Sequence, residues 1–518
     1  MVADFATRSG TAIVSTAPLP LPRRSILRRS ILRRAAATAA FGAGAWWHCA
    51  PAAEAPTAAV DELAVAILGC GIRGPAHAAE LAGRHGCRVA WVCDPDRRRA
   101  EKMADDVALL QSSRPRVASD LRTPLDDASL DIVTVATPNH WHALAAILAM
   151  EAGKDVYVEK PVCHSIEEGQ RLAATARRLQ RICQGGTQAR SLPCLAEARA
   201  LVAAGGIGKP TLARMLYTSH RQPIGGPGAF QPPREVNYDL FCGPAPLSPL
   251  TRPQFHYDWH WFWTTGDGDL GNNGIHFLDA ARNLLALEGP GAATLSFGTR
   301  AGYADAAETP HTQVSVTLFP DVTLVTEIRN LKEAADIDGL AMGVQIHGSE
   351  GRLVWKSQSP AVAILDPAGA IVKTISGRGD HQKHHFANFV AAVKARDPHL
   401  LAARIEEGVQ STALCHLGNI SYRLGDDQGF DDVAARLAER MPGEEPRHLL
   451  ARLRQHLADN GCAPATGQIR CGPWVETSAG KATSAEALAA DSGPVVVDPG
   501  AQALERLDYR RPFLLPPP

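Results

Sequence analysis

A glycine-rich turn between a buried strand and a helix constrains the fold of this chain most strongly. Residues 63–70 (LAVAILGC) are apolar, and the Gly-x-Gly-x-x-Gly segment from Gly69 to Gly74 follows at once, ahead of the helix-like run PAHAAELAGRH. In such a unit Gly69 permits the tight turn, Gly71 lets a pyrophosphate approach the backbone, and Gly74 allows close helix–strand packing. The sequence therefore predicts a dinucleotide-binding unit, with a ligand-free glycine-rich turn as the alternative.

An acidic residue indicates which dinucleotide fits. The next predicted strand, residues 88–93, ends at Asp94, 20 residues after Gly74. Asp94 would accept hydrogen bonds from the adenosine ribose, and it would repel a 2′-phosphate. We therefore expect NAD rather than NADP, although Arg97, Arg98 and Arg99 lie close enough to soften that preference.

Strand–helix alternation continues to about residue 190. Further strands are predicted over 130–136, 155–158 and 181–186, with helices over 140–152 and 166–180. Repeated strand–helix units imply a parallel sheet, whose ligands bind beyond the carboxyl ends of the strands. The predicted cofactor-binding residues are Gly69, Gly71, Ile72, Arg73, Gly74, Asp94, Thr137, Pro138, Asn139, His142, Glu159, Lys160 and Gln188.

Four motifs, GCGIRG, TPNHWHA, EKPV and GNNGIHFLDAARNLL, occur here in an order and spacing that resemble the glucose–fructose oxidoreductase / inositol dehydrogenase / MocA (Gfo/Idh/MocA) family. The resemblance covers residues 63–425. The HGSEG turn, the late helix pair from His384 to Gly425 and the terminal YRRPF are similar to a secreted branch common in planctomycetes. The resemblance implies an α/β fold, in which a Rossmann doubly wound parallel sheet precedes an α/β domain with an open, mainly antiparallel sheet. It also implies a homo-oligomer that forms through that second sheet.

The resemblance implies two catalytic residues. Lys160 of the EKP motif would lie beside the nicotinamide and the reacting carbinol, and His276 of GNNGIH would face it. Oxidation of an alcohol removes a hydride and a proton, and a desolvated amine near cationic NAD⁺ has a lowered pKa that suits proton transfer. A histidine within reach could relay that proton. Taken alone, Lys160 could also be a solvated surface lysine.

One position departs from the family pattern. Many family dehydrogenases carry an acidic residue four positions before the histidine, where this chain has Asn272. Asparagine can hydrogen-bond a sugar hydroxyl, but it cannot hold a proton or a negative charge. This puts an acid-assisted relay in doubt. Asp279, three residues after His276, would either orient that histidine or pair within its helix.

Residues 255–263 (FHYDWHWFW) are dense in aromatic side chains. Flat aromatic faces beside polar groups suit a carbohydrate ring, whereas the alternative is that the tryptophans anchor a long connection on the core. The predicted substrate-binding residues are Lys160, Arg190, Trp259, His260, Trp261, Asn272, His276 and Asp279. His381, His384 and His385 have no matching third ligand, so we expect solvated or capping histidines and no metal.

The first 55 residues predict an export signal. The twin-arginine sequence RRSILR at 23–28 is repeated at 28–33, and the weakly apolar run 35–47 is too short to span a bilayer core of about 30 Å. Ala53-Glu54-Ala55 resembles a signal cleavage site. We expect a periplasmic protein, or a cytoplasmic one if these residues are only a basic arm or follow a misassigned start. No other run approaches 18 apolar residues, so no membrane span is expected, and a formal charge of −1 argues against nucleic-acid binding.

The predicted organisation is a signal region (1–55), an NAD-binding Rossmann domain (56–190), a substrate and oligomerisation domain (191–425) and a C-terminal extension (426–518). In the extension, residues 431–458 predict one or two amphipathic helices, and a wrapping tail is expected after Gly461. The expected function is NAD-dependent oxidation of a sugar, polyol or glycoside hydroxyl with a tightly held cofactor. The alternatives are a glycoside hydrolase that works by redox-assisted elimination, and a non-catalytic nucleotide- or sugar-binding protein.

Overall fold

The structure is a computed structural model that describes residues 62–334, 336–357, 359–441, 443–478 and 495–516. The predicted signal region, residues 1–55, lies outside the described residues. Those that are described belong to a single unit, residues 59–518.

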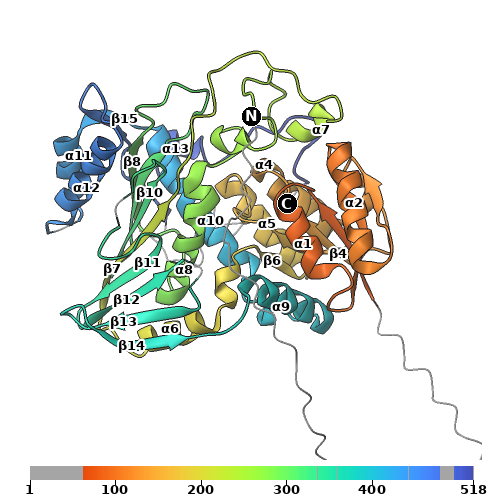
Figure 1. The fold of residues 1–518 in the computed structure, drawn as a ribbon, viewed down its shortest axis with the longest axis horizontal. Coiled ribbons are helices and arrows are strands. Elements are labelled where there is room, and N and C mark those ends of the chain that lie inside the picture. The colour runs from red at the N-terminus through yellow and green to blue at the C-terminus, as the bar shows by residue number, and fades with distance from the viewer. Residues whose placement is uncertain (1–61, 335, 358, 442, 479–494, 517–518) are drawn as a thin grey trace, which may run out of the picture. The chain divides into compact units, whose positions relative to one another are not determined.

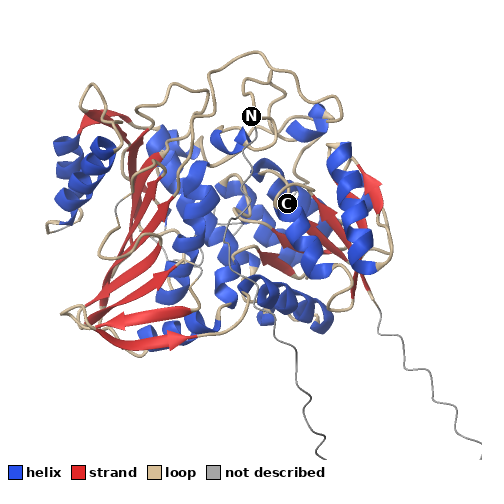
Figure 2. Ribbon diagram, in the orientation of Figure 1, coloured by secondary structure: helices blue, strands red, loops and turns tan. Residues whose placement is uncertain are grey.

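Residues 63–185 form a six-stranded parallel sheet at the start of the described chain (Figures 1 and 2). Its strands are β1 (Leu63–Leu68), β2 (Cys87–Cys93), β3 (Arg116–Ala118), β4 (Ile132–Val135), β5 (Asp155–Val158) and β6 (Cys183–Gly185). Its helices are α1 (Arg73–Leu81), α2 (Arg97–Gln111), α3 (Arg122–Leu125), α4 (Asn139–Glu151) and α5 (Ile166–Arg178). The strand order β3-β2-β1-β4-β5-β6 is that of a Rossmann fold, so the predicted doubly wound parallel sheet is confirmed.

A second, larger sheet follows. Its strands are β7 (Pro210–Thr218), β8 (Ala293–Thr299), β9 (Thr312–Leu318), β10 (Thr323–Arg329), β11 (Gly343–Gly348), β12 (Gly351–Lys356), β13 (Ala361–Leu365), β14 (Ile371–Ser376), β15 (Asp426–Gly429), β16 (Gln468–Cys471) and β17 (Val475–Glu476). Neighbouring strands pair antiparallel except β7 and β10, which pair in parallel. This confirms the predicted mainly antiparallel second sheet.

Long helices fill the space between the two sheets (Figure 1). They are α6 (Pro193–Ala203), α8 (Ile275–Leu285) and α10 (Ile405–Arg423), while α9 (His381–Ala395) packs on the core of the parallel sheet. Helix α10 belongs to both cores: Ile405 and Val409 are buried with the parallel sheet, and Leu417 and Ile420 with the second sheet. Because one buried helix serves both cores, the two halves are held together by packing.

The C-terminal extension covers one end of the opposite face of the second sheet, beside β8 and β15, as Figure 1 shows. Helices α11 (Phe430–Ala438) and α12 (Glu445–Asp459) form the predicted amphipathic helices, and their apolar side chains pack on β8, β9 and β10. Arg452 of α12 contacts Glu327 of β10 at 3.1 Å. The extension therefore occupies part of the sheet face that the resemblance assigns to oligomer contacts.

The segment after residue 461 differs from the predicted tail, because β16 and β17 extend the second sheet beside β8. The remaining short elements are α7 (Tyr238–Cys242), α13 (Pro499–Gln502), the 3₁₀ turns η1 (Gln188–Ser191), η2 (Asp258–Trp261) and η4 (Pro398–Leu400), and the π-turn η3 (Leu270–Gly274). Among the described residues, those after α13 form neither helix nor strand, and there the Phe513 ring packs edge-on against Trp141 with ring centroids 5.4 Å apart. Within the described residues, the helices are too short or too polar to cross a bilayer.

Candidate active site

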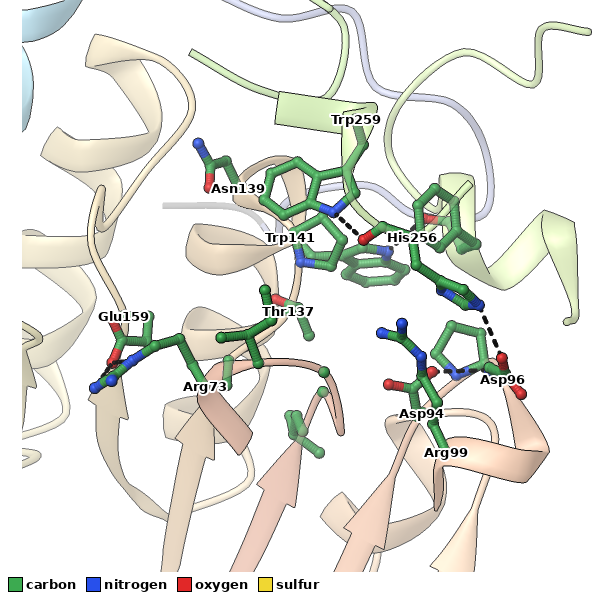
Figure 3. Close-up of a pocket in the computed structure, with 18 of the residues that line it drawn as sticks. Arg73, Asp94, Asp96, Arg99, Thr137, Asn139, Trp141, Glu159, His256 and Trp259 are labelled. Carbon is green, nitrogen blue, oxygen red and sulfur yellow. Dashed lines mark hydrogen bonds and ion pairs between the residues drawn. The ribbon is translucent and has the colours of Figure 1, made fainter. Parts of the chain in front are cut away.

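A cleft of about 350 Å³ runs along the carboxyl ends of β1, β2, β4 and β5. Its floor is the parallel sheet with the glycine turn, and its roof is a segment of the second half between residues 236 and 260. Figure 3 shows Trp259 and His256 of the roof across from Arg73, Asp94 and Thr137 of the floor. The cleft is thus the ligand crevice that a doubly wound sheet creates.

The glycine turn has the geometry that its spacing predicts. Gly69 has φ +92°, and a Cβ there would lie 2.4 Å from the Ala136 carbonyl oxygen. A Cβ on Gly74 would lie 2.1 Å from the Gly69 carbonyl oxygen, so Gly74 serves packing and does not line the cleft. Gly71 does line it, and the nearest atom to an added Cβ would be an Arg99 nitrogen at 3.2 Å.

The start of helix α1 is open to the cleft. Among the described residues no side chain caps its first turn, so its N–H groups are left for a ligand. The N-cap residue, Ile72, is 74% exposed although it is a large apolar side chain. The buried Oγ1 of Thr137, which also lines the cleft, has no partner within the described part of the chain. Free amides, a bare apolar side chain and an unsatisfied hydroxyl all fit the pyrophosphate and riboses of a dinucleotide.

Asp94 and Arg99 mark the adenosine end of the cleft. The Asp94 carboxylate accepts hydrogen bonds from the backbone N–H groups of Cys70 and Asp96, both at 2.8 Å, so its position is fixed. Burial raises the pKa of Asp94, and the two N–H groups oppose that rise. Each carboxylate oxygen keeps a second lone pair, with which it can accept a ribose hydroxyl.

The roof is tied to the floor at this end. The backbone N–H of Asn237 donates to the Pro95 carbonyl at 2.9 Å, and His256 Nε2 lies 3.0 Å from an Asp96 carboxylate oxygen. Trp141 of α4 donates from its indole nitrogen to the Leu240 carbonyl at 3.1 Å. The adenosine end is therefore enclosed by contacts between segments that are far apart in the sequence.

Lys160 stands at the other end of the cleft, just after β5. Its Nζ donates to the backbone carbonyl of Asn272 at 2.6 Å and to Asn272 Oδ1 at 3.1 Å. Burial is the main reason that the pKa of Lys160 falls to about 8, against the attraction of Glu159. An amine with this pKa can both take up and release a proton near neutrality.

Glu159 is the buried partner of Arg73. Arg73 Nε donates to Glu159 Oε1 at 3.0 Å, and His77 Nε2 lies 3.0 Å from the same oxygen. Burial alone would raise the pKa of Glu159, but the Arg73 charge and the His77 contact hold it well below its usual range. Both Glu159 and Arg73 line the cleft, where their charges largely compensate each other beside Lys160.

His260 and Trp259 form the roof above this end. Burial lowers the pKa of His260 to about 4, and the neutral ring donates from Nδ1 to the Tyr257 carbonyl at 2.6 Å. Its Nε2 is then an acceptor. The Trp259 ring stacks on His260 with centroids 3.6 Å apart, and both line the cleft. Trp261 is instead buried with Ile224, which corrects its predicted substrate contact.

The structure also corrects three predictions around η1. Arg190 pairs with Asp279 at 2.9 Å, and the Ser411 hydroxyl donates to Asp279 at 2.7 Å. The guanidinium and the carboxylate therefore connect η1 with α8 and α10. Gln188 is buried and donates to the Tyr157 hydroxyl at 2.9 Å. These three predicted ligand contacts lie outside the cleft lining.

His276 lies close enough to Lys160 for charge interaction, but it does not line the cleft. Burial and the Lys160 charge lower the pKa of His276 to about 3, so the ring is neutral at physiological pH. Burial also lowers the pKa of His142, whose ring nitrogens lie 2.6 Å from the Pro161 carbonyl and 2.8 Å from the Thr137 carbonyl. His276 therefore supports the site from behind, whereas His142 lines the cleft.

Other predicted residues divide between the cleft and the core. Ile72, Pro138, Asn139 and Asn272 line the cleft, and Asn139 Nδ2 donates to the buried Asp267 at 2.7 Å. His385 is fully buried, with Nε2 2.9 Å from the Gly185 carbonyl, so it is not a solvated histidine. Its partner is backbone, as is usual for an internal ring nitrogen.

Sequence reasoning missed two charged residues of the site. Arg221 follows β7 and lines the cleft, and its Nε donates to the buried Asp269 at 2.9 Å. Asp269 in turn accepts from Asn273 Nδ2 at 2.7 Å and from Asn272 Nδ2 at 3.2 Å. The local signal for Asp269 was the acidic run Gly266-Asp-Gly-Asp269, which ends one residue before GNNGIH. Arg221 carries no such signal, because it comes from a distant loop.

The fold and the cleft together define an α/β protein in which a Rossmann sheet with its ligand crevice is joined to a second, mainly antiparallel sheet. Residues 63–187 match the oxidoreductase family with an NAD-binding Rossmann fold, and residues 228–450 match the C-terminal alpha/beta domain of the same family. The chain belongs to the Gfo/Idh/MocA oxidoreductase family.

Among curated relatives, the chain is 35% identical over 146 residues to scyllo-inositol 2-dehydrogenase (NAD(+)) of Bacillus subtilis, covering 28% of this chain and 41% of that enzyme. It is 32% identical over 128 residues to a glycosyl hydrolase family 109 protein of Shewanella baltica, covering 24% of this chain and 28% of that protein. The chain thus spans less than half the length of these two relatives.

Two solved structures show the same fold. The WlbA dehydrogenase of Bordetella pertussis, in complex with NADH and UDP-GlcNAcA, superposes with a TM-score of 0.51 at 19% identity, covering 70% of this chain and 97% of that one. Levoglucosan dehydrogenase, in complex with NADH and levoglucosan, gives a TM-score of 0.52 at 18% identity, covering 68% and 95%.

Proposed function

We propose that this protein is an oxidoreductase that transfers hydride between NAD and a secondary hydroxyl of a sugar, polyol or glycoside. The observation that carries the proposal is the continuity of one cleft, which begins at Asp94 and the glycine turn and ends at Lys160. An adenosine site and an amine of lowered pKa stand at opposite ends of the same enclosure.

The chain's own groups perform the acid–base half of the reaction. In the oxidation direction, neutral Lys160 takes the proton of the substrate hydroxyl, and the C–O bond becomes a carbonyl as the carbon loses its hydride. Nicotinamide, when bound, is the hydride acceptor. His260 Nε2 accepts a hydrogen bond from a neighbouring substrate hydroxyl, because its Nδ1 already donates to Tyr257. With a pKa of about 8, about a tenth of Lys160 is neutral at pH 7.

A carbohydrate suits the roof of the cleft better than a small acid does. The indole of Trp259 offers a flat apolar face for sugar C–H groups, and His260, Asn272 and Asn273 line the same end with hydrogen-bonding groups. Few polar groups set in an aromatic wall are typical of small-molecule sites.

The test uses the purified full chain. After denaturation, the released nicotinamide is identified by chromatography, and a panel of sugars, polyols and glycosides is then mixed with native protein while the absorbance of reduced nicotinamide is followed. Lys160→Met should abolish the signal, and Lys209→Met, which changes an exposed lysine paired with Asp321, should not. Absence of both bound nicotinamide and any reduction by the panel would refute the proposal.

We also propose that the cofactor stays bound between turnovers and that the protein is exported in folded form. The tethers between roof and floor, such as Asn237 with Pro95, support retention. The repeated twin-arginine sequence at 23–33 and the likeness to a secreted branch support export. Replacing the arginines of both RR pairs by lysine should move the protein from the periplasmic to the cytoplasmic fraction, and an unchanged distribution would contradict export.

A second reaction is supported by the likeness of 128 residues of this chain to glycosyl hydrolase family 109 proteins. In redox-assisted elimination, a hydroxyl is oxidised, the neighbouring C–H becomes acidic, the glycosidic group leaves, water adds and the carbonyl is reduced again. Aryl glycosides distinguish the two reactions: release of the aryl group without net NADH indicates elimination, and a ketosugar product indicates plain oxidation.

A further inference from the structure

A buried carboxylate lies one hydrogen-bonded step behind Lys160. Asp269, which is 1% exposed, begins the π-turn that leads into α8, and Arg221 Nε donates to it at 2.9 Å. Asn330 also donates to Asp269, from the side away from the cleft lining. The remaining contacts of the carboxylate include the side-chain amide of Asn272, whose Nδ2 donates at 3.2 Å.

The Asn272 amide connects this carboxylate to the amine. Its Nδ2 faces Asp269 and its Oδ1 faces Lys160 Nζ at 3.1 Å. The two ends of an amide are not interchangeable here, because a carboxylate only accepts hydrogen bonds and an ammonium only donates them. Asp269 therefore selects the orientation in which Asn272 presents its oxygen to Lys160.

The orientation of Asn272 in turn sets the direction in which Lys160 acts. Two of the three N–H positions of Nζ are directed to the carbonyl oxygen and the Oδ1 of Asn272. The third position is an N–H when the amine is charged and a lone pair when it is neutral. Because Lys160 lines the cleft, this third position is the one left for a substrate hydroxyl.

We propose that Asp269, acting through the side-chain amide of Asn272, is the positioning residue that aims Lys160 at the substrate. It also supplies the negative charge that position 272 lacks, from three residues earlier in the chain. The inference rests on the proposed function only in giving Lys160 the role of proton carrier.

The charges around Lys160 fix the sign of the expected effects. Glu159 and Arg73 form one pair on the Rossmann side, and Asp269 and Arg221 form the other pair. His260 of η2 and His276 of α8 also face the amine, and both are neutral because burial lowers their pKa values to about 4 and about 3. Without the Asp269 charge, Arg221 is uncompensated and disfavours the charged amine.

The test measures the ionisation of Lys160 directly, with no substrate. The full chain is labelled with [ε-¹³C]lysine, the Lys160 signal is assigned from its loss in Lys160→Met, and its shift is followed against pH. In Asp269→Asn the pKa of Lys160 should fall by about one unit, and in Asn272→Asp it should rise by about one unit or more, as expected for loss or gain of a nearby opposite charge. Asn330→Ser removes a donor to Asp269 on the far side and should leave the Lys160 pKa unchanged.

An unchanged pKa in Asp269→Asn, or an equal shift in Asn330→Ser, would overturn the proposal. A crystal structure of the wild-type chain is the second measurement, and it tests the proposal even if Asp269→Asn fails to fold. If the Asn272 amide contacts only one of Asp269 and Lys160 in that structure, the link between them is refuted. Because neither readout uses turnover, a failure to find a sugar substrate would count against the proposed function and leave this inference standing.

Discussion

Helices α11 and α12 form a cap on the second sheet, and the packing of this cap predicts how much a core mutation destabilises the protein. Leu453 of α12 is 2% exposed and packs in the core that includes Phe297, Val316 and Val325 of the sheet. Leu453→Ala removes a buried isobutyl group and leaves a cavity, which should cost about 2–5 kcal/mol in the free energy of unfolding. Leu109→Ala is the matched control, because Leu109 is 87% exposed and its truncation should change the free energy by less than about 0.5 kcal/mol.

Urea unfolding gives the free energies, and amide hydrogen exchange locates the change. In Leu453→Ala, protection should fall in α11, α12 and the cap-facing strands β8 to β10, while the parallel sheet keeps its protection. Leu453→Asp should release the cap and expose the apolar face, which increases self-association measured by light scattering. If both Leu453 variants match Leu109→Ala in stability and mass, the cap does not cover the sheet as described.

Three further predictions concern the cleft. The rate of sugar oxidation should rise about tenfold per pH unit up to about pH 8 and then level off, because higher pH converts Lys160 to the neutral base. Stopped-flow assays measure this pH–rate profile, and a profile with its midpoint near 6.5 would point to a histidine as the base. Asp94→Ser should raise the affinity for NADP at least about tenfold in calorimetric titrations, because the charge that repels the 2′-phosphate is removed while Arg99 remains. If the variant and the wild type discriminate equally against NADP, Asp94 is not the cause of the discrimination. His256→Ala removes the contact between His256 and Asp96, which is worth about 1 kcal/mol. NADH release should therefore become about fivefold faster in a fluorescence displacement assay. An unchanged release rate would show that the roof does not retain the cofactor.

The parts of the fold that the sequence predicts well are those with local signals. The strand before Gly69, the turn to Gly74 and the acidic strand end at Asp94 each depend on residues that are neighbours in the chain, and the structure has all three as expected. The second half gives weaker signals. β9 alternates polar and apolar residues, which predicts one exposed face, but both of its faces are buried. In β10 the adjacent apolar residues Leu324 and Val325 interrupt the alternation. β16 and β17 escaped prediction for a different reason: they have four and two residues, and pairing with the distant strand β8 holds them in the sheet.

The errors in the site have a common physical origin. Gln188 was predicted to face the ligand because it follows a predicted strand, but it donates to the Tyr157 hydroxyl. Asp279 was predicted from its place three residues after His276, but its partners Arg190 and Ser411 come from elements that only the folded chain brings close. Burying an ion pair requires that its hydrogen bonds be completed by the protein, so charged residues near a motif are often consumed by structure. Asp269 is the opposite case: it was not predicted as a site residue, yet the structure links it to Lys160. The link is the side-chain amide of Asn272, which lies in a π-turn that no periodic sequence pattern reveals.

The roof joins two tasks that the sequence presents as separate. One segment of the second half contacts Asp96 through His256 at the adenosine end and places Trp259 and His260 above Lys160 at the reacting end. Opening the roof to exchange a dinucleotide would therefore also dismantle the proposed sugar site. If the proposed sugar site and the dinucleotide site share these contacts, a well-formed sugar site also favours retention of the cofactor, as the proposed export to a compartment with little free dinucleotide would require. Net turnover then requires that a second substrate, or the same sugar after transient oxidation, return the hydride within the cleft.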